Sequence, residues 1–243
     1  MARALSKLGY CSRSQAGELI RAGRVQLNGA ARRDPETPVK LGKDRIEIDG
    51  KPLQAEAKIY LLLNKPRGIV TTAEDEKGRD TVYSLLPAGT PWVGPVGRLD
   101  LASEGLLLLT NDSEWAAQIA APETHLDKIY HVQIGTVADD ALLHELQTGF
   151  AVEDGETLRV KRAEILRSGE KNSWLEITLD EGKNRQIRRM FEHRKIEVLR
   201  LIRVAIGPLA LADLPKGTTR ALTPTEKLAL DHAMHRRAAS AGN

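Results

Sequence analysis

The feature that most constrains the fold of this chain is the order of its predicted elements. Short apolar segments typical of strands follow helical segments without a regular alternation. Residues 106–109 form a continuous apolar run, which is typical of a buried strand. Residues 129–134 alternate apolar and polar side chains, as a half-buried strand does. Strands and long helices do not follow one another regularly, so the sequence predicts an α+β fold with a mixed sheet, and not a doubly wound parallel sheet.

The same patterns predict the individual elements along the chain. Helices are expected over 2–8, 13–22, 81–86, 138–147, from Asp112 or Ser113 to about 120, from Asn184 to about 194, and from Thr223 or Thr225 toward 236. Strands are expected over 25–27, 45–48, 59–63, 106–109, 129–134, 158–166, 174–179 and 198–206. Ser12 is the expected cap of the second helix, Asn28-Gly29 a hairpin turn, 52–58 a linker and 64–68 a loop.

Composition places the chain among globular proteins. Apolar residues make up 41% and charged residues 28% of the 243 residues, and no apolar run approaches the ~20 residues of a membrane span. Cys11 is the single cysteine, so no internal disulfide can form, and we expect a cytoplasmic protein without a membrane partner. The length suits one large domain or two smaller domains.

Positive charge is concentrated in two stretches, although the net charge is only +3. Residues 1–58 hold twelve lysines and arginines against seven acidic residues, and residues 183–200 hold seven against two. Two basic concentrations on a nearly neutral chain indicate a polyanion that is contacted at two places. The alternative for either stretch is an ordinary solvated surface.

The sequence lacks the signatures of several common chemistries. It contains no GxxxxGK[ST] loop, no GxGxxG, no HExxH and no GxSxG. We therefore expect no cofactor and no metal. For a chain rich in arginine and carboxylate, a carboxylate nucleophile is the natural candidate.

Asp100 is the best candidate for such a carboxylate, because it lies where a loop leads into the predicted strand at 106–109. Arg98 is two residues away, and an extended backbone would place both side chains on the same face. A neighbouring arginine favours the ionised form of an aspartate, as a nucleophile requires. The alternative is a buried ion pair that only holds the loop.

A basic helix is the second candidate site. Arg185, Arg188 and Arg189 have i, i+3, i+4 spacing and would share one face, which could bind phosphates. Ile187, Met190 and Phe191 would form its apolar side. The alternative is an exposed amphipathic helix.

These residues together resemble a known family. GRLDLASEGLLLLTND at 97–112 resembles the hallmark motif of pseudouridine synthases of the RsuA/RluB type, which modify ribosomal RNA. The resemblance continues in order with LLLNKPRGIVTT (61–72), KIYHV (128–132), EGKNRQIRRMF (181–191) and LIRVAIGPL (201–209). The segment LSKLGYCSRSQAGELIRAGRVQLNG (5–29) is similar to an S4 RNA-binding domain.

The resemblance implies a role for each matching residue. Asp100 matches the catalytic aspartate, Arg98 the arginine before it, and Tyr130 the tyrosine that stacks on the target base and takes part in proton transfer. Arg188 matches the basic partner of the aspartate. The implied substrate-binding residues are Ile187, Arg185, Arg189, Lys65 and Asn64. The implied RNA-binding residues of the S4-like domain are Ser12, Arg13, Arg21, Arg24 and Asn28. Many relatives have a second arginine where this chain has Ser14 and Gln15.

The resemblance also implies the architecture and the reaction. We expect an S4-like domain over 1–55, a catalytic domain with a mixed, largely antiparallel sheet flanked by helices over 56–236, and a flexible tail over 237–243. The expected reaction is isomerisation of uridine to pseudouridine in ribosomal RNA or a precursor particle, by a monomer without cofactor or metal. Large-subunit RNA is favoured over small-subunit RNA. A non-catalytic RNA-binding factor of ribosome assembly is a competing hypothesis, and so is an S4-containing RNA methyltransferase, which would need a glycine-rich cofactor loop that is absent.

Overall fold

The N-terminal part of the chain forms two helices and a four-stranded antiparallel sheet, with strand order β2-β1-β3-β4. This computed structural model describes residues 1–72, 75, 77–152 and 155–240, with side chains up to residue 235. The bounds are α1 Ala2–Lys7, α2 Arg13–Arg21, β1 Val25–Leu27, β2 Ala30–Arg32, β3 Ile46–Ile48 and β4 Lys51–Pro52. Apolar side chains of both helices and of β1 and β3 form one shared core.

Local sequence signals begin and end these elements as predicted. The Ser12 hydroxyl accepts a hydrogen bond from the Gln15 backbone, and the Gln15 side chain accepts one from the Ser12 backbone, so the pair forms a capping box. Asn28 and Gly29 have φ angles of 54° and 81°, as a type I′ hairpin turn between β1 and β2 requires. The expected cap and the expected turn are both confirmed.

The larger part of the chain is built on a nine-stranded sheet. Seven of its strands follow the order β11-β12-β8-β13-β7-β5-β15, and the other two are β14, which pairs with β13, and β6, which pairs with β7. The bounds are β5 Tyr60–Lys65, β6 Gly94–Val96, β7 Glu104–Thr110, β8 Lys128–Ile134, β11 Arg162–Ser168, β12 Ser173–Leu179, β13 Val198–Ile206, β14 Leu209–Ala210 and β15 Thr219–Ala221. Among the strands of the described residues, only β7 and β13 pair in parallel. The predicted fold class, α+β with a mixed, largely antiparallel sheet, is therefore confirmed.

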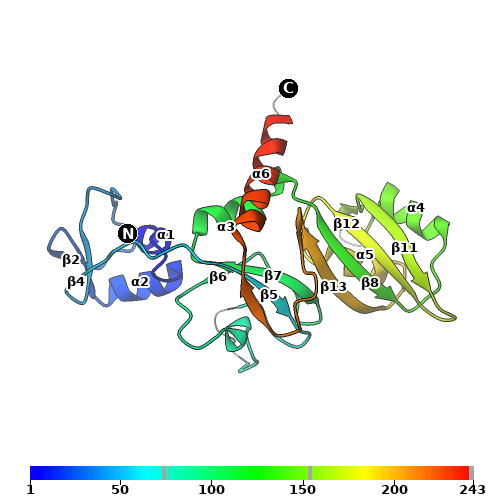
Figure 1. Ribbon diagram of the computed structural model, residues 1–243, viewed down its shortest axis with the longest axis horizontal. Coiled ribbons are helices and arrows are strands. Elements are labelled where there is room, and N and C mark those ends of the chain that lie inside the picture. Colours follow the sequence, from blue (N-terminus) through cyan, green and yellow to red (C-terminus); the bar gives the residue numbers. More distant parts are fainter. Residues whose placement is uncertain (73–74, 76, 153–154, 241–243) are drawn as a thin grey trace.

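Three apolar cores lie on this sheet, two of them under α-helices and a third that joins the short helix at 82–85 to residues 63, 107 and 109 of the sheet. The helices and remaining strands are η1 Val82–Leu85, α3 Ser113–Ala120, η2 Pro122–Thr124, α4 Asp140–Thr148, β9 Phe150–Ala151, β10 Thr157–Leu158, α5 Gln186–His193 and α6 Pro224–Ser240. One core joins α4 and α5 to β8 and β12, and a second joins α3 and α6 to β5 and β7. Figure 1 shows the N-terminal domain at one end of the long axis and β8, β11 and β12 toward the other.

Gly105 allows the two halves of the large sheet to meet. Its φ is +102°, and a Cβ atom there would lie 2.2 Å from the backbone oxygen of Arg203. β7 can therefore approach β13 closely enough to pair only with glycine at this position. This contact lies directly after the loop that carries Asp100.

Three local predictions are wrong. Asn64 and Lys65 belong to β5 and not to a loop, because they continue the pairing with β7 opposite Leu106 and Gly105. The strand expected over 158–166 is divided into β10 and β11, which pair with different partners. Helix α5 has Arg185 and not Asn184 at its cap position, since Arg185 adopts a left-handed φ of 48°.

The two domains are joined by a segment that hydrogen bonds hold in place. After β4 the chain has no regular structure over 53–59, where a linker is predicted. The Glu56 amide donates to the Leu8 carbonyl, and the buried Asn111 side chain bonds Ala57 and Ile59. At the other terminus α6 runs to Ser240, into the predicted tail over 237–243, of which 241–243 lie outside the described residues.

Candidate active site

Asp100 lies in the loop between β6 and β7, with its carboxylate half-buried at 36% exposure. Its backbone oxygen accepts hydrogen bonds from the Ser103 amide and the Lys65 ammonium, at 3.0 Å and 3.1 Å. The Asp100 carboxylate lies 3.8 Å from Nη1 of Arg185 and 4.0 Å from Nε of Arg188. The carboxylate is therefore accessible and has two guanidinium groups within 4.0 Å.

Arg188 reaches Asp100 from inside the protein. Its side chain is 11% exposed, and Nη2 donates to the Ala102 carbonyl at 2.9 Å. Burial lowers the pKa of the Arg188 guanidinium, and the charge of Asp100 opposes that effect. The Nε atom is buried without a hydrogen-bond partner among the described residues, so the nearby Asp100 carboxylate is its main electrostatic compensation.

Arg98 does not pair with Asp100 as the two-residue spacing suggests. Arg98 is exposed at the edge of the cavity, and in the described part of the chain it forms no ion pair within 4.0 Å. Leu99 between them is buried, and the Thr71 hydroxyl binds its backbone at both the carbonyl and the amide. The arginines beside Asp100 are Arg188 of α5 and Arg185 at its cap position, a region distant in sequence.

Tyr130 lies on β8 and faces the same cavity as Asp100. It is half-buried, opposite Ile177 of β12 and Arg203 of β13. Its side chain packs between two apolar cores, one of which includes Leu99 beside Asp100. An aromatic ring in this position offers a planar apolar surface in the cavity that Asp100 also lines.

The cavity between these residues has a volume of about 620 Å³. It is lined by the Asp100 loop, by one face of β8, β12 and β13, and by the segment that leads into α5. Ile187 contributes an apolar wall and is only 3% exposed. Apolar walls combined with convergent charged and polar groups are typical of a small-ligand site.

Lys65 and Asn64 support the site from behind the cavity. Lys65 is fully buried, and its ammonium donates to the carbonyls of Pro66, Asp100 and Ser103. Burial lowers the pKa of Lys65 to about 8. Asn64 donates to the Leu214 carbonyl at 2.7 Å. Lys65 thus holds the loop that carries Asp100, whereas Asn64 binds the segment that precedes β15, and neither side chain lines the cavity.

The arginines of α5 point in different directions. Arg188 is directed inward to the Asp100 loop, whereas Arg189 forms an ion pair with Glu156 at 2.8 Å. Arg185 binds Glu192 at 2.6 Å in addition to its approach to Asp100. The arginines thus do not form a single phosphate-binding face in this structure.

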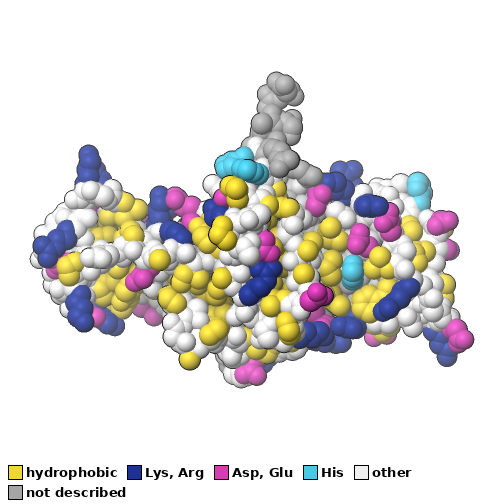
Figure 2. Space-filling model, viewed as in Figure 1, with side chains coloured by type: hydrophobic (Ala, Val, Ile, Leu, Met, Phe, Trp, Pro, Cys, Tyr) yellow, Lys and Arg dark blue, Asp and Glu magenta, His cyan; other side chains and the backbone are white. Residues whose placement is uncertain are grey.

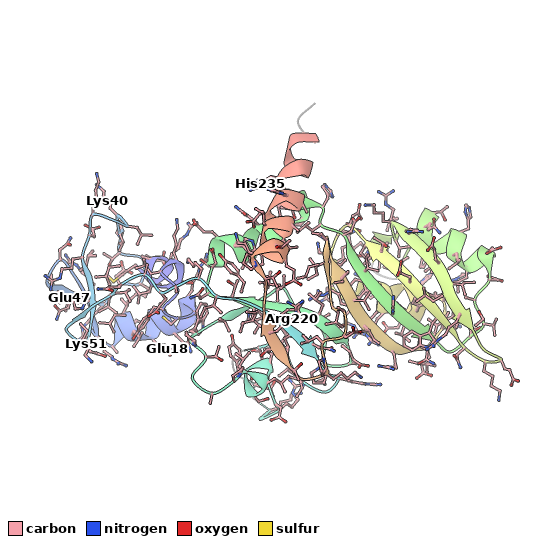
Figure 3. All side chains as sticks on the ribbon, viewed as in Figure 1. Glu18, Lys40, Glu47, Lys51, Arg220 and His235 are labelled. Atoms are coloured by element: carbon pink, nitrogen blue, oxygen red, sulfur yellow. The ribbon has the colours of Figure 1, made fainter. Side chains whose placement is uncertain are left out.

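The predicted RNA-binding residues of the N-terminal domain lie on its surface. Ser12 caps α2, Arg24 forms a bidentate ion pair with Asp49, and the Asn28 side chain donates to Asp44. Arg13 and Arg21 of α2 are exposed. Figure 2 shows lysine and arginine side chains around the outer edge of this domain, and Figure 3 shows Lys40 and Lys51 there.

Two cavity residues, Lys128 and Arg203, were not predicted. Both face the cavity from the sheet, next to Tyr130. The signal was present in KIYHV and LIRVAIGPL, each of which has a basic residue on a strand that is otherwise mostly apolar.

No helix of the described residues is long and apolar enough to span a membrane.

Comparison with known proteins shows the family of this chain. Residues 59–193 match the RNA pseudouridylate synthase family model, and residues 2–46 match the S4 domain model. The chain is 39% identical to ribosomal large subunit pseudouridine synthase B of Bacillus subtilis, over 92% of each chain. It is 36% identical to the protein of that name from Haemophilus influenzae, over 88% of this chain and 62% of the other.

A solved structure supports the same relationship. The fold superposes on the crystal structure of a pseudouridylate synthase with a TM-score of 0.67 and 28% identity, over 94% of this chain and 98% of the other. An RNA pseudouridine synthase of Aquifex aeolicus is 38% identical over 91% of this chain and 89% of its own. The chain belongs to the RNA pseudouridine synthases of the RsuA/RluB type and carries an N-terminal S4 domain.

Proposed function

We propose that this enzyme converts a uridine of large-subunit ribosomal RNA to pseudouridine, with Asp100 as the catalytic nucleophile. One observation carries the proposal. The Asp100 carboxylate is accessible at a cavity of about 620 Å³, flanked by two arginines and adjacent to Tyr130. The cavity admits a single flipped base, and its carboxylate can reach the sugar or the base.

The neighbouring residues have distinct roles in this proposal. Tyr130 stacks on the target uracil and takes part in proton transfer, and Ile187 closes the apolar side of the base site. Arg188 supplies a positive charge 4.0 Å from the Asp100 carboxylate. Arg98, which is exposed at the edge of the cavity, contacts the RNA next to the target nucleotide.

The proposed reaction balances without a cofactor. The C1′–N1 bond breaks, the uracil turns, a C1′–C5 bond forms, the C5 proton is released and N1 gains a proton. Asp100 can attack C1′, attack C6, or promote elimination to a glycal, and each route returns the carboxylate unchanged. The net change is an isomerisation with no oxidant or reductant.

RNA binding supplies the free energy to expose the base. Flipping a base out of a folded RNA costs a few kcal/mol. We assign the compensating phosphate contacts to Arg185 and Arg189 and to an S4 domain over 1–55, through Ser12, Arg13, Arg21, Arg24 and Asn28. When RNA binds, Arg24 and Arg189 would either leave their ion pairs with Asp49 and Glu156 or contact a phosphate while they keep these ion pairs.

The choice of large-subunit RNA is supported by the similarity to the Bacillus subtilis and Haemophilus influenzae proteins, which are named as large-subunit enzymes. Small-subunit RNA is the alternative. The test measures tritium release from large- and small-subunit transcripts labelled at C5 of uridine, with Asp100→Ala as the blank. We expect release from large-subunit RNA by the wild type alone. Release from small-subunit RNA alone would overturn the proposed substrate, and release by Asp100→Ala would overturn the role of Asp100.

A further inference from the structure

Three polar side chains lie together on the sheet face that lines the cavity. Lys128 and Tyr130 are two residues apart on β8, so their side chains lie on one face of the sheet. Arg203 of β13 is directly opposite Tyr130, which places its side chain on that same face. All three line the cavity that Asp100 also lines.

Arg203 is buried, and its guanidinium is incompletely hydrogen-bonded. The residue is 5% exposed, and Nε donates to the Leu106 carbonyl at 2.7 Å. Nη2 is buried and has no hydrogen-bond partner among the described residues. An unpaired buried donor is destabilising, and more so on a charged group than on a neutral one. A ligand with an acceptor oxygen in the cavity would remove this cost.

Lys128 places a second positive charge beside Arg203. Burial and the charge of Arg203 lower the pKa of Lys128, whereas Asp127 and Asp180 oppose this effect. The Asp127 carboxylate forms an ion pair with Lys161 at 2.7 Å. Within the described ranges, no carboxylate forms an ion pair within 4.0 Å with Lys128 or with Arg203. Two adjacent, partly desolvated cations repel each other until negative charge is placed between or next to them.

The surroundings of this pair favour a flat apolar ligand over a hydrated phosphate. Leu179, Leu201 and Ile206 line the cavity beside the two cations, and Tyr130 supplies an aromatic face. We propose that Arg203, assisted by Lys128, binds a carbonyl oxygen of the target uracil and stabilises the negative charge that the base acquires during the reaction. This inference rests on the proposed function.

The charge appears on every route considered for Asp100. When the C1′–N1 bond breaks, its electron pair stays with the uracil, which becomes an anion with charge shared by N1, O2 and O4. When a carboxylate adds to C6 instead, the electrons of the C5–C6 bond move toward O4. In each case a carbonyl oxygen gains negative charge that it lacks in the substrate, so a cation there accelerates the reaction.

The experiment compares Arg203→Met and Lys128→Met with the wild type on the same ribosomal RNA transcript. Single-turnover rates and RNA dissociation constants are measured over a range of salt concentrations. Arg203→Met should lower the rate about 10²–10³-fold, with the dissociation constant and its salt dependence unchanged. Lys128→Met should lower the rate by a smaller factor, and Arg203→Lys should recover part of the loss.

Two controls separate this role from a structural one. Arg167→Met removes an arginine that stacks on Trp174 outside the cavity and should leave the rate unchanged. Arg203→Met loses the hydrogen bond from Nε to the Leu106 carbonyl, so thermal melting is recorded for each variant to show that it is folded. If Arg203→Met does not fold, Lys128→Met provides the test of the proposal. An RNA with sulfur in place of O2 or of O4 should slow the wild type but add little to Arg203→Met.

The outcomes decide between this proposal and its competitors. Weaker RNA binding with a smaller salt dependence, and an unchanged rate at saturating RNA, would assign Arg203 to a phosphate and overturn the proposal. Full activity of both folded variants would overturn it as well, while the proposed function stands. An inactive wild type on both ribosomal RNAs would overturn the proposed function, and this inference with it.

Discussion

Lys65 lies fully buried under the loop that carries Asp100, and its three hydrogen bonds to carbonyls fix that loop. Its pKa is lowered from 10.5 to about 8, mainly by burial. Between pH 8 and pH 10.5 the unfolded chain binds a proton at Lys65 that the folded protein does not bind. The contribution of Lys65 to the free energy of unfolding therefore rises as the pH increases from 8 to 10.5.

The variant Lys65→Met should lack this rise. We expect the wild type to gain a few kcal/mol relative to Lys65→Met between pH 8 and 10.5, since one pKa unit corresponds to about 1.4 kcal/mol. Urea denaturation of both proteins across this range measures the difference. A constant difference between the two proteins would show that the pKa of Lys65 is not lowered by burial.

Candidate site residues could be named from the sequence motifs, and the family resemblance also named Arg188 as the partner of Asp100, but local spacing did not predict which side chains meet. Asp100 and Tyr130 lie in motifs and both line the cavity. The pairing of Arg98 with Asp100 was predicted from spacing alone and is not formed, because Arg98 is exposed and the guanidinium groups near the carboxylate are those of Arg185 and Arg188. Arg188 approaches Asp100 only because α5 packs against the sheet, and no local pattern encodes that contact.

At the scale of the elements, β7 and β13 form the junction that brings Asp100 and Arg203 to one cavity. Gly105→Ala would place a Cβ atom against the Arg203 backbone and force a positive φ on alanine. The φ strain alone costs about 1–3 kcal/mol, and the clash adds to it. We expect a loss of more than about 2 kcal/mol in the free energy of unfolding.

Gly182→Ala is the matched control for this prediction, because Gly182 has open space around it and no positive φ. Its free energy of unfolding, measured in the same urea titration, should match the wild type. Equal stability of Gly105→Ala and Gly182→Ala would contradict the close approach of β7 to β13.

Elements with local signals were predictable, and those set by distant pairing were not. The Ser12 cap and the Asn28-Gly29 turn follow from neighbouring residues, and both are present. The extension of β5 through Lys65 depends on its partner β7, which begins about forty residues later in the chain. The left-handed Arg185 at the start of α5 likewise has no signal in the residues around it.

At the scale of the whole molecule, the position of the S4 domain depends on a few contacts at the connecting segment. Asn111 is fully buried and bonds Ala57 and Ile59, while Lys58 donates to the Lys7 carbonyl and Lys7 pairs with Glu114. The sequence predicted a linker here but could not show that it is fixed, because its partners come from α1, α3 and the end of β7.

Asn111→Ala should loosen this connection. The variant removes the side-chain hydrogen bonds to the Ala57 carbonyl and the Ile59 amide, at a cost of about 0.5–1.5 kcal/mol each. We expect trypsin to cleave after Lys58 several times faster than in the wild type, as followed by mass spectrometry. Asn184→Ala, at an exposed position, is the control and should leave the cleavage rate unchanged.

The most direct test of the account is the activity of Asp100→Asn beside Asp213→Asn, an exposed aspartate outside the site. Asparagine keeps the size of the side chain and removes its charge, and RNA affinity is measured for each protein. The account predicts that Asp100→Asn binds large-subunit ribosomal RNA like the wild type but releases no tritium from C5-labelled uridine, while Asp213→Asn is fully active. Wild-type release by Asp100→Asn would contradict the central role of the Asp100 carboxylate.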